Sequence, residues 1–249
     1  MTEKPDRDPK KQPRCALRAV AGLLVFFALG GFGFWQLLVH PASPLPPEWN
    51  PTKPLVVAEP LSWVTPGKLR RALRDPAACL AALPAGAQIT RLEPLEIDEQ
   101  CHVRNRVVVV GLGDARMRPL QTSCAIALRA AMWERHALQP AAERHLNTRV
   151  TSISQIGSYN CRPIRTPDGP STRMSTHATA EAIDITGFEF ADGRRATLQD
   201  HWGSVTFGAF LEAARDGACR WFATTLGPEF NALHADHFHL QSRGWGTCR

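Results

Sequence analysis

The sequence lacks several features that mark common functional classes. Its seven cysteines include no Cys-x-x-Cys pair, which argues against a zinc ribbon or a thioredoxin-type redox site. It has no nucleic-acid-binding motif, no internal repeat and little excess charge in its bulk. The net charge is +6, and the first 40 residues supply half of it, with six Lys or Arg and three Asp or Glu. We therefore expect no nucleic-acid partner.

A long apolar run near the N-terminus predicts one transmembrane helix. Residues 19–39 are apolar apart from Gln36, and about 20 residues span a bilayer core as a helix. A cleaved signal peptide is the alternative, but its apolar region usually has about 7–15 residues, and this run lacks a clear cleavage site. The basic segment 1–18 favours a cytoplasmic N-terminus, so the rest of the chain is expected to be exported.

Cysteine usage supports this topology. Cys15 lies at the cytoplasmic edge of the span, which leaves an even number of widely spaced cysteines on the exported side. These are Cys79, Cys101, Cys124, Cys161, Cys219 and Cys248. Export and an even count predict up to three disulfides. Their pairing stays open, and buried free thiols are the alternative.

Proline separates the span from a folded domain. Residues 40–54 contain six prolines, which favours extended polyproline geometry and predicts a semi-rigid linker over 40–61. The domain 62–249 then has enough apolar residues for a core of its own.

Within that domain the pattern is mixed. Helical spacing recurs over residues 66–83, with a break at Pro76, and again over 122–138 and 205–222. β-Branched or alternating runs over residues 101–113, 149–159 and 236–241 predict strands. Helices that interleave with short strands predict an α+β domain, with a small, mostly antiparallel sheet flanked by helices.

A histidine cluster near the C-terminus suggests a site. The stretch "HADHFHL" contains His234, Asp236, His237 and His239. The strand period places His237 and His239 on one face and their apolar neighbours on the other. Upstream, the alternating run "AEAIDIT" places Asp184 on one face of a strand, and His177 precedes it by seven residues. Two adjacent antiparallel strands would present His177, Asp184 and His239 to one point.

Two imidazoles and one carboxylate form a zinc ligand set that leaves a fourth position for water. Zinc lowers the pKa of such a water, and His237, on the same face as His239, is placed to take its proton. Neither an isolated His-x-His motif nor an Asp on a strand is specific for a metal site. The hypothesis of a zinc site rests on the two segments together.

These residues resemble two related groups. His177-x6-Asp184 followed by His-x-His resembles the zinc signature of the D-alanyl-D-alanine peptidase group, which includes VanX-type dipeptidases, the penicillin-insensitive murein endopeptidase and the Hedgehog N-terminal domain. The wider context, "IGSYNCR…STHATAEAIDITGF…LGPEFNALHADHFHL", resembles the bacterial extensin-like C-terminal domain family over roughly residues 65–248. The resemblance implies a Hedgehog/D-Ala-D-Ala-peptidase-like fold, zinc on His177, Asp184 and His239, and a single-pass protein of the bacterial inner membrane with its domain in the periplasm.

The resemblance leaves the catalytic base open. The murein endopeptidase pattern His-x-x-His-x-His matches His234, His237 and His239, which favours His237. VanX-type enzymes use an acid three residues before the last ligand, which here is Asp236. Strand alternation points Asp236 away from the metal face, so we favour His237, with Asp236 orienting a neighbouring imidazole.

One position departs from the usual motif, Ser-x-His-x-x-Gly-x-Ala-x-Asp. Ala180 replaces the glycine, which is unfavourable if the backbone there has a positive φ. The three ligands are intact, so loss of activity is not indicated.

Several residues are candidates for substrate binding. Arg162, Arg165 and Arg173 surround the loop before His177, and a peptide carboxylate needs a bidentate cation. We favour Arg162, with Ser175 and His234 as further substrate-binding candidates. The aromatic residues Tyr159, Trp202, Trp221 and Trp245 are expected in the core.

The sequence thus predicts a membrane-anchored zinc peptidase that acts on peptidoglycan stem peptides. The alternatives are a wall-peptide-binding module with a structural zinc, whose fourth position a residue such as His234 or His237 would close, and a disulfide-stabilised envelope domain without metal.

Overall fold

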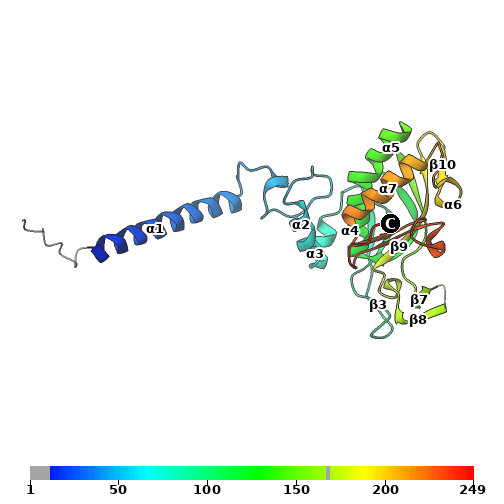
Figure 1. Ribbon diagram of the computed structural model, residues 1–249, viewed down its shortest axis with the longest axis horizontal. Coiled ribbons are helices and arrows are strands. Elements are labelled where there is room, and N and C mark those ends of the chain that lie inside the picture. Colours follow the sequence, from blue (N-terminus) through cyan, green and yellow to red (C-terminus); the bar gives the residue numbers. More distant parts are fainter. Residues whose placement is uncertain (1–11, 167–168) are drawn as a thin grey trace, which may run out of the picture. The chain divides into compact units, whose positions relative to one another are not determined.

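The computed structural model describes residues 12–166 and 169–249 (Figure 1). The chain forms two compact units. The first comprises the described residues up to Lys53 together with Leu61–Thr65, and the second comprises Pro54–Pro60 and Pro66–Arg249. Most of the predicted cytoplasmic segment 1–18 lies outside the described residues.

The first unit contains one long helix. α1 runs over Gln12–Val39, and its segment Ala16–Val39 has a mean hydropathy of 1.9, so it is long and apolar enough to cross a membrane. A signal sequence near the N-terminus can meet the same criteria of length and hydropathy.

The proline-rich segment after α1 is folded, in contrast to the extended linker predicted over residues 40–61. The carbonyl oxygen of Leu38 accepts hydrogen bonds from Asn50 Nδ2 at 2.8 Å and Thr52 Oγ1 at 3.1 Å, and Asn50 is fully buried. A short 3-10 helix, η1 (Pro47–Trp49), lies within this segment. The last carbonyls of a helix have no intrahelical partner, and here side chains from the following loop supply donors.

The second unit begins earlier than the predicted boundary at residue 62. Leu55 and Val57 are buried, and the backbone N–H of Val57 donates to the carbonyl of Ala82 at 2.9 Å. Residues 54–60 therefore pack as part of the second unit.

The described helices of the second unit include short and medium elements. Their bounds are α2 (Thr65–Ala72), α3 (Pro76–Ala81), α4 (Cys124–Trp133), η2 (Glu134–Leu138), α5 (Gln139–Leu146), η3 (Thr176–Thr179), α6 (Leu198–His201), α7 (Gly208–Trp221) and η4 (Ala232–His234).

The strands are mostly short. Their bounds are β1 (Gln88–Arg91), β2 (Leu95–Glu96), β3 (His102–Val103), β4 (Arg106–Gly111), β5 (Arg116–Ser123), β6 (Val150–Gly157), β7 (Pro163–Thr166), β8 (Gly169–Met174), β9 (Ala182–Phe190), β10 (Arg195–Thr197), β11 (Thr224–Leu226) and β12 (Phe238–Gln241).

The main sheet has eight strands in the order β1-β4-β5-β6-β9-β12-β11, with β10 paired to β9. Its pairs are antiparallel except β5 with β6. Two hairpins, β2–β3 and β7–β8, form separate two-stranded sheets. This arrangement confirms the predicted α+β class with a mostly antiparallel sheet flanked by helices.

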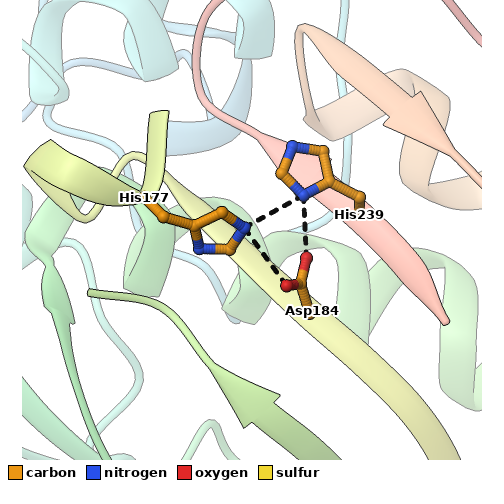
Figure 2. A group of neighbouring side chains, drawn as sticks. All are labelled: His177, Asp184 and His239. Atoms are coloured by element: carbon orange, nitrogen blue, oxygen red, sulfur yellow. Dashed lines mark hydrogen bonds and ion pairs between the residues drawn. The ribbon is translucent and has the colours of Figure 1, made fainter. Parts of the chain in front are cut away.

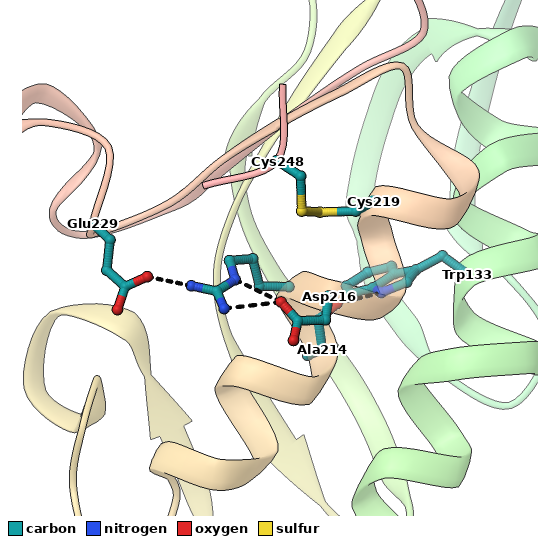
Figure 3. The surroundings of a disulfide bond; sticks show 7 residues. Trp133, Ala214, Asp216, Cys219, Glu229 and Cys248 are labelled. Atoms are coloured by element: carbon teal, nitrogen blue, oxygen red, sulfur yellow. Dashed lines mark hydrogen bonds and ion pairs between the residues drawn. A yellow bond between two sulfur atoms is a disulfide. The ribbon is translucent and has the colours of Figure 1, made fainter. Parts of the chain in front are cut away.

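Helices α4, α5 and α7 pack together beside the sheet (Figure 1). Between them and the sheet lies an aromatic core in which the Phe188 ring packs against Trp133 and Phe210. The Trp133 indole N–H donates to the carbonyl of Ala214 in α7 at 2.9 Å, as Figure 3 shows. This core holds β9 in place from one side.

The six cysteines that follow α1 form three disulfides, as the even count predicts. The pairs are Cys79–Cys124, Cys101–Cys161 and Cys219–Cys248. The last of them ties α7 to the segment after β12 (Figure 3).

Candidate metal centre

The site begins with two neighbouring antiparallel strands. In the β9–β12 ladder His239 is the direct partner of Asp184. Directly opposed residues in an antiparallel pair place their side chains on the same face of the sheet. Phe238 and Leu240, on either side of His239, are fully buried, so the apolar core fixes the register and aims the imidazole towards the carboxylate (Figure 2).

The third side chain comes from the short helix η3. The Ser175 hydroxyl caps this helix by accepting the His177 backbone N–H at 3.3 Å. Ala180 ends the η3 helix with a left-handed backbone, at φ 49°. This is the position where the motif usually has glycine, and the positive φ is the conformation that makes alanine unfavourable there. The backbone N–H of Ala180 donates to the His177 carbonyl at 3.1 Å, and the carbonyl of Ala180 accepts the backbone N–H of Ser123 at 3.3 Å. These bonds hold a conformation that alanine disfavours.

A backbone contact sets the tautomer of His177. Its Nδ1 lies 2.6 Å from the carbonyl oxygen of Ser158, and because a carbonyl only accepts, Nδ1 carries the proton. Nε2 then points towards the other two side chains (Figure 2). An outer hydrogen bond that orients the imidazole in this way is common for histidines that bind metals.

The three side chains converge on one point. His177 Nε2 lies 3.2 Å from Asp184 Oδ2 and 3.1 Å from His239 Nδ1, which in turn lies 2.7 Å from Asp184 Oδ1. Among the described residues this is the group whose ligand atoms, all within 4.8 Å of one another, could hold a metal ion. All three residues are buried, with Asp184 9% exposed.

The chemistry of these atoms fits a cation. Each offers a lone pair to the centre, and two imidazoles facing each other with a carboxylate need either bound protons or a shared positive ion. Two nitrogens and one oxygen are the donors that zinc accepts in catalytic sites. We therefore find that the residues present fit a zinc ion.

Charge in the site favours the ionised carboxylate. Burial acts to raise the pKa of Asp184, but when the two imidazoles are protonated, hydrogen bonds from His177 and His239 and their positive charge outweigh it, and the pKa lies well below its ordinary value. Asp184 is therefore an anion at every physiological pH, as a metal ligand must be.

The structure separates the two candidates for the catalytic base. His237 faces the site, with Nε2 3.8 Å from Asp184 Oδ1. Asp236 points away, and its side chain is 59% exposed. Asp236 Oδ1 lies 2.8 Å from His237 Nδ1, so the carboxylate accepts the Nδ1 proton and leaves Nε2 directed towards Asp184.

His234 adds a neutral imidazole beside these groups. Its ring centroid lies 5.2 Å from that of His237 and 5.6 Å from that of His239. Burial, followed by the positive neighbours His239 and His237, lowers the pKa of His234 to about 4. Its Nδ1 lies 2.7 Å from the side-chain oxygen of Asn231, so at neutral pH this nitrogen donates and Nε2 is free to accept.

Asp184, His234, His237 and His239 line a cleft of about 1040 Å³. Four arginines are among the residues that line the cleft, namely Arg162, Arg165, Arg173 and Arg243. Among the described lining residues Asp184 is the one carboxylate. Arg243 pairs with Glu181 at 3.0 Å, whereas no described carboxylate lies within ion-pair distance of Arg162. Burial and the nearby Arg165 lower the pKa of Arg162, and Asp184 opposes that effect.

Some predicted roles change with the geometry. Ser175 lines the cleft but uses its hydroxyl to cap η3. The prediction of a core position was right for the buried Trp221 and wrong for Trp245, which is 101% exposed at the cleft rim. Sequence reasoning missed Arg243, Phe230 and Leu233 as lining residues. For Trp245, the two flanking glycines were the available signal of exposure, because they indicate a loop rather than a packed strand.

Comparison with known proteins identifies a family. The family described as "Extensin-like protein C-terminus" matches residues 77–249, which include all three converging side chains. No curated protein and no solved structure matches the chain.

Proposed function

The chain belongs to the extensin-like protein C-terminus family, and from that premise and the site geometry we propose that it is a membrane-anchored zinc peptidase that hydrolyses peptide bonds of peptidoglycan in the periplasm. The observation that carries the proposal is the convergence of His177, Asp184 and His239 beside a cleft that Asp184, His237 and His239 line. The resemblance of these residues to the zinc signature of the D-alanyl-D-alanine peptidase group supports the same reaction.

His177 Nε2, His239 Nδ1 and one oxygen of Asp184 would hold the zinc. When bound, zinc supplies a Lewis acid that polarises a peptide carbonyl and makes water a better nucleophile near neutral pH. Ser158 and the capped η3 helix keep His177 oriented for this task. Asp184 remains ionised and offsets the charge of the metal.

His237 is the proposed general base and later the general acid. Asp236 accepts the proton on Nδ1, so Nε2 carries the lone pair that can remove a proton from water and return it to the leaving amine. Asp236 then acts through His237 as a positioning residue. Its 59% exposed side chain points away from Asp184, which makes it a poor base for the same water.

The arginines that line the cleft would favour anionic peptides as substrates. Stem peptides carry free carboxylates, and a guanidinium that has no carboxylate partner within the protein can bind one with two parallel hydrogen bonds. Arg162 is half-buried in the cleft and lies near enough to Asp184 to interact with its charge. We assign Arg162 to the substrate carboxylate nearest the scissile bond, and His234 to a hydrogen bond with the peptide backbone.

The helix α1 and the disulfides support the proposed location of the protein. The apolar length of α1 and the basic residues before it suit a single-pass inner-membrane anchor with a cytoplasmic N-terminus. Three disulfides suit an oxidising compartment such as the periplasm.

A second candidate is a wall-peptide-binding module with a structural zinc. It is favoured by the position of His237 Nε2, 3.8 Å from Asp184 Oδ1, since a small rotation would make this imidazole a fourth ligand. A site closed by four protein ligands has no position for water.

The test uses the full chain in detergent, with its disulfides formed. Zinc content is measured alongside digestion of purified peptidoglycan, and His239→Ala is the control. We expect about one zinc per chain and new muropeptides that disappear in the variant and with chelator, and fragment masses will identify the bond. Zinc without cleavage would favour the binding module, and absence of zinc would contradict both.

A further inference from the structure

The cleft has a second feature that the peptidase reaction does not use. Trp245 stands at its rim and is 101% exposed, in the same cleft that His237 and His239 line. An exposed indole within a cleft presents a large, flat apolar face on which a ligand can stack.

The loop that carries Trp245 is held firmly. Gly244 and Gly246 on either side have positive φ, at 140° and 81°. A Cβ at Gly244 would collide with the hydroxyl oxygen of Thr224, so the loop lies directly against β11. Gly246 N–H donates to Ala223 O at 2.9 Å, and Thr225 N–H donates to Thr247 O at 2.8 Å.

The disulfide Cys219–Cys248 fixes the far end of the same loop to α7 (Figure 3). The indole is therefore presented on a backbone that is tied on both sides. A ligand that stacks on it has little loop ordering to oppose binding.

The surroundings restrict the chemistry of that ligand. Arginine dominates the charged side chains of the cleft, with Asp184 as the one carboxylate among the described lining residues. A cationic ligand, which an aromatic face could otherwise attract, is disfavoured there. Near the indole, Thr224, Thr247 and Arg243 also line the cleft, and they offer hydroxyl and guanidinium groups to hydrogen-bond acceptors and hydroxyls.

A flat apolar face bordered by hydrogen-bonding groups matches a pyranose ring, whose C–H face is apolar and whose edge carries hydroxyl and acetamido groups. We propose that Trp245 forms a subsite for an N-acetylated sugar of the glycan strand. The choice of this sugar rests on the proposed peptidoglycan substrate. The enzyme then acts on stem peptides that are still attached to glycan, and Trp245 is a specificity-determining residue.

Binding is tested first, without any need for hydrolysis. The full chain, in a detergent without a sugar head group, is titrated with the trimer of N-acetylglucosamine and followed by calorimetry and tryptophan fluorescence. We expect saturable binding that weakens at least tenfold in Trp245→Ala and less in Trp245→Phe. Trp63→Phe, which changes another exposed indole, is the matched control and should bind as the unchanged chain does.

Kinetics supply the second test. Trp245→Ala should raise KM about tenfold for a peptide linked to its disaccharide, about 1.4 kcal/mol, and leave both kcat and the KM for the free peptide unchanged. A chain that binds the trimer through Trp245 but cleaves nothing would keep the sugar subsite and contradict the peptidase. No saturable binding, equal binding by Trp245→Ala, or preference for an aromatic ligand over the trimer would overturn the subsite.

Discussion

Nδ1 of His239 lies 2.7 Å from Oδ1 of Asp184 because the two residues face each other across the β9–β12 ladder. The contact joins two segments 55 residues apart in the chain. It makes the relative position of these two donors a property of the sheet register rather than of a flexible loop, so a change at either residue tests the metal site without disturbing the loops around the cleft.

Asp184→Asn is expected to abolish zinc binding. The amide keeps the shape of the side chain but removes the negative charge that a zinc site with two neutral imidazoles needs. Zinc measured by mass spectrometry should fall from about one equivalent to background. His234→Gln, a change beside the site, should keep its zinc. Retention of zinc by Asp184→Asn would place the ion elsewhere.

The roles of His237 and Asp236 can be separated by rate. His237→Gln should lower kcat by about 10²–10⁴-fold, the usual size of general acid–base catalysis, while zinc is retained. Asp236→Asn should have a smaller effect, because it disturbs only the orientation of the ring. If Asp236→Asn lowers kcat more than His237→Gln does, the Asp236 carboxylate is the general base. Loss of zinc in His237→Gln would instead support a closed structural site.

Arg162→Ala should raise KM for stem peptides about tenfold, since a charge-assisted bidentate contact is worth on the order of 1.5–3 kcal/mol. Arg162→Lys should recover part of the loss, because it restores the charge but not the paired geometry. Arg195, exposed on β10 and paired with Glu189 at 3.1 Å, is the matched control. Steady-state kinetics in which Arg195→Ala and Arg162→Ala behave alike would remove the assignment.

His234 should make stability depend on pH. Its pKa in the folded chain is about 4, below the ordinary value near 6.5, so the unfolded chain binds more protons between these values. Stability is therefore greatest above about pH 6.5 and decreases as the pH falls towards 4. In urea denaturation at several pH values, His234→Gln should show a smaller decrease over this window. An identical slope in both proteins would contradict the lowered pKa.

Replacing Cys219 and Cys248 together by serine should lower the free energy of unfolding by about 3 kcal/mol, the size expected from the chain entropy of a loop of this length. Their sequence separation is 29 residues. Denaturant midpoints compare the variant with the unchanged chain. Because this disulfide also holds the Trp245 loop, sugar binding should weaken in the same variant while zinc content is unchanged.

Local periodicity accounts for much of what could be predicted. Strand alternation predicts that His239 faces Asp184, and the β9–β12 ladder pairs these two residues. Asp236 lies in the turn before β12, which begins at Phe238, so its 59% exposure is not set by the strand period. The even cysteine count predicts three disulfides, but their pairing depends on tertiary neighbours. The Ser158 carbonyl that orients His177 is a backbone atom, and no sequence pattern identifies such a contact in advance.

Other features depend on packing that residue types do not reveal. The helix expected over residues 122–138 becomes α4 followed by a π-helical turn, η2, and α5 then begins with Pro140 near its start. Proline has no N–H to donate within a helix, and the wider turn accommodates it. The proline-rich segment folds because Asn50 and Thr52 find the free carbonyl of Leu38, and composition alone suggested an extended chain.

The position of β12 between β9 and β11 determines when the site can exist. β12 follows every other described strand in the sequence, yet it is inserted inside the sheet and carries His239. A growing chain that has not yet produced residues 238–241 contains His177 and Asp184 but lacks His239 and the strand that carries it. A metal ion held by all three side chains can therefore enter only after β12 has paired with both β9 and β11, and the compartment in which this pairing takes place would decide which ion is available.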